Sequence, residues 1–166
     1  LYREEIIPRN ITDQFDPIRI PKVSDREIKA LQDNEVMIML DAVSTGEHLT
    51  EKEKQYWKKT KKRDKAILVL FLTYGLRLSE LQQLNVSSFN FQRGEFTVYR
   101  KRGKESAMPL NNRTVLRALR EYIEEERMSE EKIKPGHEDA LFLSLQGRRM
   151  TERQIRELVK KYTSIA

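Results

Sequence analysis

The spacing of apolar residues predicts that most of this chain is helical. Apolar side chains recur every three or four positions in three stretches, as they do along the buried face of a helix. The stretches are Val36, Met37, Leu40 and Val43; Val115, Leu116, Leu119, Tyr122 and Ile123; and Ile155, Leu158, Val159 and Tyr162. Ser24, Thr50 and Thr151 each precede a Glu or Gln by three positions, the capping-box pattern of a helix start. Asp33 or Asn34 is the expected cap of the first stretch, and Asn111 or Asn112 that of the second.

The run from Ala66 to Tyr74 is apolar on every side, so its period alone does not separate a helix from a buried strand. Gly75 directly after the run is typical of a helix C-terminus, as Gly46 is for the first stretch. The charged residues before the run suit a helix start. We therefore expect a buried central helix from Ala66 to Tyr74, followed by a short helix over Leu78 to Leu84.

The period then changes to two, which predicts strands. Phe89 and Phe91 alternate with polar neighbours, and Phe96 and Val98 fall on one face of the next strand. Arg102-Gly103 can close a hairpin, because glycine supplies the positive φ that a tight turn needs. The returning strand covers Glu105 to Leu110. The expected fold is therefore α+β: mainly helical, with a small three-stranded antiparallel sheet.

The remaining segments set the domain boundaries. Residues 1–22 contain three of the five prolines and little helical period, which predicts an extended linker before a domain over residues 23–166. Lys134-Pro135-Gly136 predicts a loop, and the short apolar segment Ala140 to Leu145 is compatible with helix or strand.

Composition narrows the function classes. The chain of 166 residues has a formal net charge of +6, no cysteine and only two histidines, His48 and His137. Disulfides, thiolate zinc sites and histidine-rich metal centres are thereby excluded or disfavoured. The longest apolar run is too short to span a bilayer, and no secretory signal is present. The positive charge favours a polyanionic partner, with nucleic acid as the first candidate and an anionic membrane surface as its rival.

The most basic segment runs from Lys58 to Lys65. Asp64 is the only acid inside it. Such a run is more often a solvated face than a DNA contact, and we favour the solvated face here.

Three motifs follow one another in a fixed order. Gly75-Leu76-Arg77-Leu78-Ser79-Glu80-Leu81 places an arginine at the mouth of a helix. The segment Arg100 to Glu105 forms the hairpin turn, and Pro109-Leu110 closes the last strand. This order and spacing resemble the catalytic domain of the tyrosine recombinases, the phage integrase family, and within it the Xer-type members. The resemblance covers roughly residues 24–166.

The resemblance implies site-specific DNA recombination through a 3′-phosphotyrosine intermediate, without a metal or other cofactor. It implies that Arg77 is a catalytic residue that binds the non-bridging oxygens of the scissile phosphate, where negative charge develops. Lys101 is implied as the general acid that protonates the departing 5′-oxygen, with Lys104 as the alternative at the same turn. Glu80 would orient the site. The plain alternatives are an ion pair between Arg77 and Glu80, and an edge-strand lysine at position 101 that prevents aggregation.

The resemblance also implies partners and a cellular role. The intact protein would act in the cytoplasm as a tetramer on duplex DNA, with no membrane and no small-molecule substrate. Xer-like chromosome-dimer resolution and mobile-element integration are both compatible with the motifs. The candidate DNA-binding residues are Arg100, Arg102, Lys104, Arg148, Arg149 and Arg153. For the last three, as for Arg156, phosphate contact and plain solvation are equally compatible with the pattern.

The pattern departs from complete members of the family. No His-x-x-Arg motif is present, and the helical spacing of Tyr162 marks a core residue rather than a nucleophile. We therefore expect this chain to be the front part of the catalytic domain, inactive by itself, with the apolar stripe of its last helix left exposed. A DNA-binding module without catalysis and a basic helical domain with a protein partner remain the alternatives.

Overall fold

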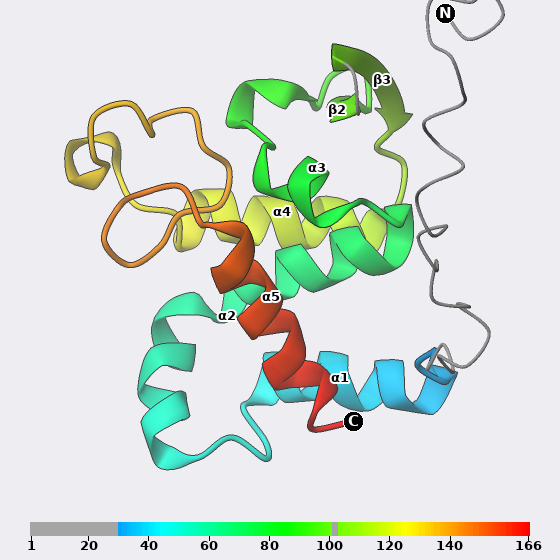
Figure 1. Ribbon diagram of the computed structural model, residues 1–166, viewed down its shortest axis with the longest axis vertical. Helices are drawn as coiled ribbons and strands as arrows, with labels where there is room; N and C mark the ends of the chain where they lie inside the picture. The colour runs from blue at the N-terminus through cyan, green and yellow to red at the C-terminus, as the bar shows by residue number, and fades with distance from the viewer. Residues whose placement is uncertain (1–29, 101–102) are drawn as a thin grey trace, which may run out of the picture. The chain divides into compact units, whose positions relative to one another are not determined.

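The structure, a computed structural model, describes residues 30–100 and 103–166 (Figure 1). These residues form five α-helices and a three-stranded sheet, joined by loops. The helices are α1 (Asp33–Thr45), α2 (Glu51–Tyr74), α3 (Leu78–Gln82), α4 (Arg113–Glu125) and α5 (Glu152–Thr163). The strands are β1 (Phe89–Asn90), β2 (Glu95–Arg100) and β3 (Lys104–Pro109), and short 3₁₀ turns cover Val86–Ser88 and Glu130–Lys132. The α+β prediction is thereby confirmed. The predicted linker over residues 1–22 and the helix start at Ser24 lie outside the described residues.

The helix ends follow the local signals in the sequence. The Oγ1 of Thr50 accepts a hydrogen bond from the backbone N–H of Glu53, whose carboxylate accepts one from the N–H of Thr50 at 2.9 Å. Thr151 and Gln154 form the same box before α5. Gly75 ends α2 in the left-handed region, at φ 57°. The cap of α1 is the exception, because Gln32 and not Asp33 or Asn34 precedes the first helical turn.

Helix α2 is longer than expected. The prediction that a helix starts at Ala66, after the basic run, is wrong, since one helix extends from Glu51 to Tyr74. It changes direction near its middle (Figure 1). There the carboxylate of Glu126, which follows α4, accepts hydrogen bonds from the backbone N–H groups of Lys62 and Arg63 at 2.9 and 2.8 Å. Helices bend where a side chain takes over N–H groups of the helical ladder in this way.

The sheet is antiparallel in the order β1-β2-β3, as predicted. Phe96 and Val98 of β2 are buried, and the ring of Phe96 stacks on that of Phe89 with centroids 5.1 Å apart. Phe91 does not extend β1, which ends at Asn90 where a turn begins. In the β2–β3 ladder Arg100 faces Lys104. Lys101 and Arg102, at the turn of the predicted hairpin, lie outside the described residues.

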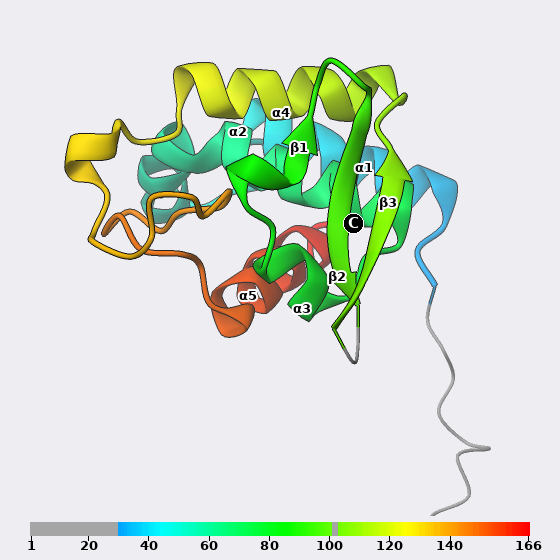
Figure 2. The same cartoon turned by 90° about the horizontal axis from the view of Figure 1, so that it is seen from above.

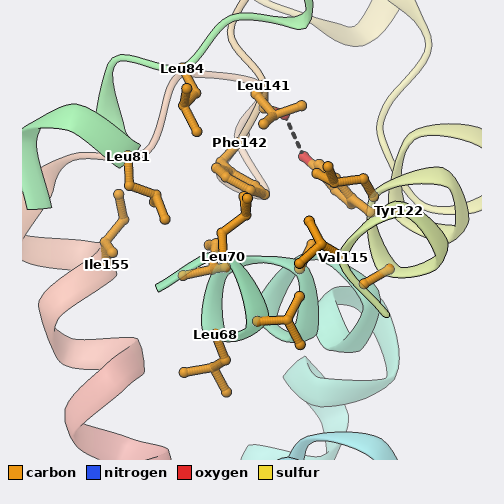
Figure 3. Close-up of a cluster of buried hydrophobic side chains, with 14 of the residues drawn as sticks. Leu68, Leu70, Leu81, Leu84, Val115, Tyr122, Leu141, Phe142 and Ile155 are labelled. Atoms are coloured by element: carbon orange, nitrogen blue, oxygen red, sulfur yellow. Dashed lines mark hydrogen bonds between the residues drawn. The ribbon is translucent and has the colours of Figure 1, made fainter. Parts of the chain in front are cut away.

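The core surrounds the second half of α2. Figure 2 shows α4 on one side of this helix, and α3 and α5 on the other. Figure 3 shows the side chains that meet there, among them Leu70 of α2, Leu81 of α3 and Ile155 of α5. Tyr122 of α4 is buried with them. Its hydroxyl donates to the carbonyl oxygen of Leu141 at 3.0 Å and accepts from the N–H of Leu143 at 3.2 Å.

Both hydrogen bonds go to the segment Ala140 to Leu145, whose conformation the sequence left open between helix and strand. It is neither helix nor a regular strand, but an irregular segment, buried from Ala140 to Ser144, with isolated bridges to Asn85 and Arg149. Leu141 and Phe142 enter the core, which explains the apolar run.

The expectation of an exposed stripe on the last helix is wrong. Ile155, Leu158 and Tyr162 are buried, because α5 packs against α1 and α3 and its Tyr162 hydroxyl donates to Asp64 of α2 at 3.3 Å. Val159, the fourth residue of the stripe, is half-buried. The prediction that Tyr162 is a core residue is confirmed. Within residues 30–100 and 103–166, no helix is both long enough and apolar enough to cross a membrane.

Candidate active site

The first candidate residue, Arg77, lies at the start of α3. The chain leaves α2 through Gly75, buries Leu76, and then presents Arg77 as the residue that caps α3. Its backbone N–H donates to Oε2 of Glu80 at 2.9 Å, while its side chain is 64% exposed. The local fold therefore fixes the Arg77 backbone and leaves most of the guanidinium facing solvent.

Glu80 is the buried centre of this site. Its side chain is only 3% exposed, and one of its oxygens, Oε1, faces two arginines. Arg77 Nη1 lies 3.4 Å from it and Arg100 Nη1 lies 3.9 Å from it. A carboxylate at this depth needs cationic partners, because burying an unpaired charge is costly. The result is two cations around one carboxylate, with a net positive charge that faces solvent.

The sheet supplies the second arginine. Arg100 is the last residue of β2, and Lys104, the first residue of β3, lies directly opposite it in the ladder. Lys104 is exposed. The structure thus brings together Arg77, Glu80, Arg100 and Lys104, whereas the predicted positions Lys101 and Arg102 lie outside the described residues.

The three predicted DNA contacts near α5 differ in environment. Arg148 is exposed before the helix, and Arg153 is exposed on it and pairs with Glu157 at 2.9 Å. Arg149 is turned inward: its Nη1 donates to the carbonyl oxygens of Gln82 and Leu84 at 3.0 and 2.9 Å. Its Nη2 bonds to the side-chain oxygen of Asn85. Arg149 is therefore corrected from a DNA-binding candidate to a residue that satisfies the carbonyl groups after α3.

Several cations of the basic run contact other residues of the chain. Lys61 lies over the ring of Trp57, 5.0 Å from its centroid, and Lys62 pairs with Glu125. Arg63 bonds to Asp64 through Nε and Nη2, at 3.0 and 2.8 Å. Lys58 and Lys59 remain exposed. The run is not one continuous cationic surface.

Sequence reasoning missed the importance of Asp64. This buried carboxylate joins α2 to α5: besides Arg63, its partners are the hydroxyls of Thr60 and Tyr162 and the ammonium group of Lys161. Burial and the neighbouring Asp64 raise the pKa of the Tyr162 hydroxyl above its ordinary value. The available signal was that Asp64 is the single acid in a basic run beside the most apolar segment. It indicated a paired, buried charge.

Comparisons with known proteins show the family of the chain. The model of the phage integrase family matches residues 29–166. The chain belongs to this family. Tyrosine recombinase XerC of Alcanivorax borkumensis is 32% identical over 146 residues, covering 87% of this chain and 43% of that protein. Tyrosine recombinase XerD of Oceanobacillus iheyensis is 41% identical over 101 residues, covering 61% and 33%. The chain thus spans less than half the length of these relatives.

Solved structures show the same fold. The crystal structure of XerA recombinase aligns with a TM-score of 0.62 and 18% identity, covering 84% of this chain and 44% of that one. XerH site-specific recombinase bound to its difH substrate aligns with a TM-score of 0.60 and 18% identity, covering 82% and 37%. The recombinase-type α+β fold is therefore shared, with this chain matching part of each structure.

Proposed function

We propose that the whole protein containing this chain is a tyrosine-type site-specific recombinase, which cuts and rejoins duplex DNA through a 3′-phosphotyrosine intermediate. The observation that carries the proposal is the arrangement of Arg77 and Arg100 on the buried Glu80, in a chain of the phage integrase family. The exposed guanidinium of Arg77, held with Arg100 at one carboxylate, is a preorganised site for a phosphodiester.

The reaction assigns a separate task to each group. A tyrosine hydroxyl loses its proton to solvent and its oxygen attacks the phosphorus, so that a new P–O bond forms and the bond to the 5′-oxygen breaks. Arg77 donates hydrogen bonds to the non-bridging oxygens, where negative charge increases in the transition state. Lys101 gives its proton to the departing 5′-oxygen, with Lys104 as the alternative donor. Because Tyr162 is buried and bonded to Asp64, we assign the attack to a tyrosine other than Tyr162.

Duplex DNA as the partner is supported by the structural neighbours. XerH site-specific recombinase was solved bound to its difH substrate, and the Tn1549 transposon integrase in complex with circular intermediate DNA. We extend this partner to the present chain, together with a tetrameric assembly on DNA and a cytoplasmic location. Relatives named XerC and XerD support chromosome-dimer resolution, and the transposon integrase supports mobile-element integration.

The test is Arg77→Ala in the whole protein. We expect strand cleavage of a labelled suicide substrate to fall about 100-fold or more, because the lost contact is strongest in the transition state. DNA affinity should change little. The matched control is Arg93→Ala, which removes an exposed arginine of the β1–β2 turn that pairs with the partly exposed Glu95 at 3.8 Å.

The same experiment decides between the proposal and a DNA-binding module without catalysis. Unchanged cleavage by Arg77→Ala would contradict the catalytic assignment. Wild-type protein that binds duplex DNA but never cuts it would favour the binding module.

A further inference from the structure

Arg100 stands where the β2–β3 hairpin leaves the core. Val98 is fully buried, whereas the next two residues, Tyr99 and Arg100, are exposed. No apolar side chain of β2 therefore anchors the end of the strand beyond Val98. The ladder pairs Arg100 with Lys104 of β3, and side-chain contacts of Arg100 add to this pairing.

The Arg100 side chain makes two such contacts. Nη1 lies 3.9 Å from Oε1 of Glu80 on α3, and Nη2 lies 3.7 Å from the sulfur of Met108 on β3. The side chain is 41% exposed. The guanidinium of Arg100 thus links the end of β2 to β3 and to α3.

We propose that Arg100 is a positioning residue: through the carboxylate it shares with Arg77, it fixes the end of β2 at the mouth of α3. The inference rests on the proposed recombinase function. Lys101, the proposed proton donor, is joined to Arg100 by one peptide bond. Proton donation to the 5′-oxygen therefore depends on Arg100, although Arg100 itself transfers no proton.

The charges around Glu80 support this role. Arg77 must direct its N–H groups toward phosphate oxygens during the reaction, which competes with its bond to Glu80 at 3.4 Å. Arg100 is a second cation at the same oxygen, so the buried carboxylate stays compensated when Arg77 turns to the phosphate. If Arg100 only bound a phosphate, proton donation to the leaving 5′-oxygen would not depend on it.

The test compares two DNA substrates in the whole protein. One has the ordinary scissile phosphate, and the other has sulfur at the bridging 5′ position, a leaving group that needs no proton. Arg100→Ala should slow cleavage of ordinary DNA by about 10- to 100-fold, the effect of misplacing a reacting group by about 1 Å. Most of this loss should disappear with the sulfur substrate, as it should for Lys101→Ala and should not for Arg77→Ala.

The outcomes separate the inference from the function on which it rests. Arg93→Ala, which removes an exposed arginine from the same sheet, should cleave both substrates like the wild type. If Arg100→Ala lowers DNA affinity and cleavage together and sulfur restores nothing, Arg100 is only a phosphate contact and the inference fails. If Arg77→Ala and Lys101→Ala are both without effect, the recombinase assignment fails instead. Arg100→Ala should remain folded, because Arg77 still pairs with Glu80 at 3.4 Å, and unfolding curves check this.

Discussion

A single carboxylate decides how Arg77 is to be understood. Glu80 is buried, and its charge must be compensated by the two arginines around it. The ion pair that seemed an alternative to a catalytic Arg77 is therefore part of how the site is built. An exposed i,i+3 pair would contribute little, whereas a buried acid that shares two cations holds both in a defined place.

Gly147 shows how one residue without a side chain closes the segment before α5. Its φ is 72°, and an added Cβ would lie 2.4 Å from the carbonyl oxygen of Lys132. Gly136 has a similar φ of 84°, but a Cβ there would meet nothing within 4 Å. A side chain would be strained by the positive φ at both positions, but only at Gly147 would its Cβ clash with another residue.

We therefore predict that Gly147→Ala destabilises the chain clearly more than Gly136→Ala. Positive φ alone costs a non-glycine residue about 1 kcal/mol or more, and only Gly147→Ala must also move the backbone at Lys132. Urea unfolding of both variants measures the difference. Equal losses of unfolding free energy would show that the loop relaxes around the new methyl group.

For single residues, sequence patterns predict the element in which a residue lies better than they predict what its side chain contacts. Arg149 and Arg153 appeared equivalent because both lie in a basic stretch near the last helix. The structure turns Arg149 onto carbonyl groups after α3 and leaves Arg153 on the surface of α5. The distinction depends on residues about 65 positions away in the chain, which no local pattern contains.

Helix α2 is the element in which local and distant effects meet. Its ends were predictable, because Thr50, Glu53 and Gly75 act within a few residues of the helix termini. Its continuity through the basic run was not predictable. Glu126, more than 60 positions later, binds the N–H groups in its middle and stabilises the bend.

We predict that Glu126→Ala lowers the unfolding free energy by about 1–3 kcal/mol, the cost of leaving part-buried N–H groups without an acceptor. Glu126→Gln should lose less, because the amide oxygen still accepts one of the two bonds. Urea unfolding at pH 7 measures both variants. A loss in Glu126→Gln as large as that in Glu126→Ala would mean that the negative charge, and not the acceptor, matters.

The unfolding free energy of the wild type should depend on pH differently from that of Glu126→Gln. Burial raises the pKa of the Glu126 carboxyl above its ordinary value of 4.5, although the N–H groups of Arg63 and Lys62 oppose the shift. The folded state therefore holds this proton more tightly than the unfolded state does. The resulting stabilisation is present below pH 4.5 and disappears as the pH rises through the folded-state pKa.

The expected result is that the stability of the wild type relative to Glu126→Gln falls as the pH rises from about 4 to 7. Unfolding curves of both proteins at several pH values provide the measurement. A relative stability that rises with pH would assign the folded Glu126 a lowered pKa and contradict the role of burial.

At the scale of the whole molecule, some cations are paired with groups of the protein and others are exposed to solvent. The net charge of +6 suggested a nucleic-acid partner, but several cations bind within the fold. Arg63 pairs with Asp64, Lys62 with Glu125, and Arg149 with carbonyl groups. The two cations around Glu80 are partly exposed, and they come from the N-cap of α3 and the end of β2.

Sequence reasoning predicted the elements of this arrangement but not how they cover one another. The hairpin register and the helix caps follow from neighbours in the chain. The burial of the α5 stripe does not, because its cover comes from α1 and α3 and from Asp64, about 100 positions earlier. A local pattern shows that a face is apolar, and only the packing shows what lies on it.

The final prediction concerns DNA binding by the 166-residue chain itself. It should bind duplex DNA weakly and mainly through phosphates, so that the logarithm of the association constant falls linearly with the logarithm of the salt concentration. Lys104→Ala, beside the Glu80 site, should reduce the slope by about 0.9, the value for one phosphate contact. Lys59→Ala removes an equally exposed lysine from α2 and is the matched control.

Denaturing gels of the same mixtures should show no covalent adduct, because the hydroxyl of Tyr162 is buried against Asp64. Fluorescence titrations at several salt concentrations measure the slopes. Binding that ignores salt, or an equal change of slope in Lys59→Ala, would contradict a DNA-facing surface centred on Glu80. A detergent-resistant band that disappears in Tyr162→Phe would instead make Tyr162 the nucleophile, and would require α5 to leave the core for the hydroxyl to reach a phosphate.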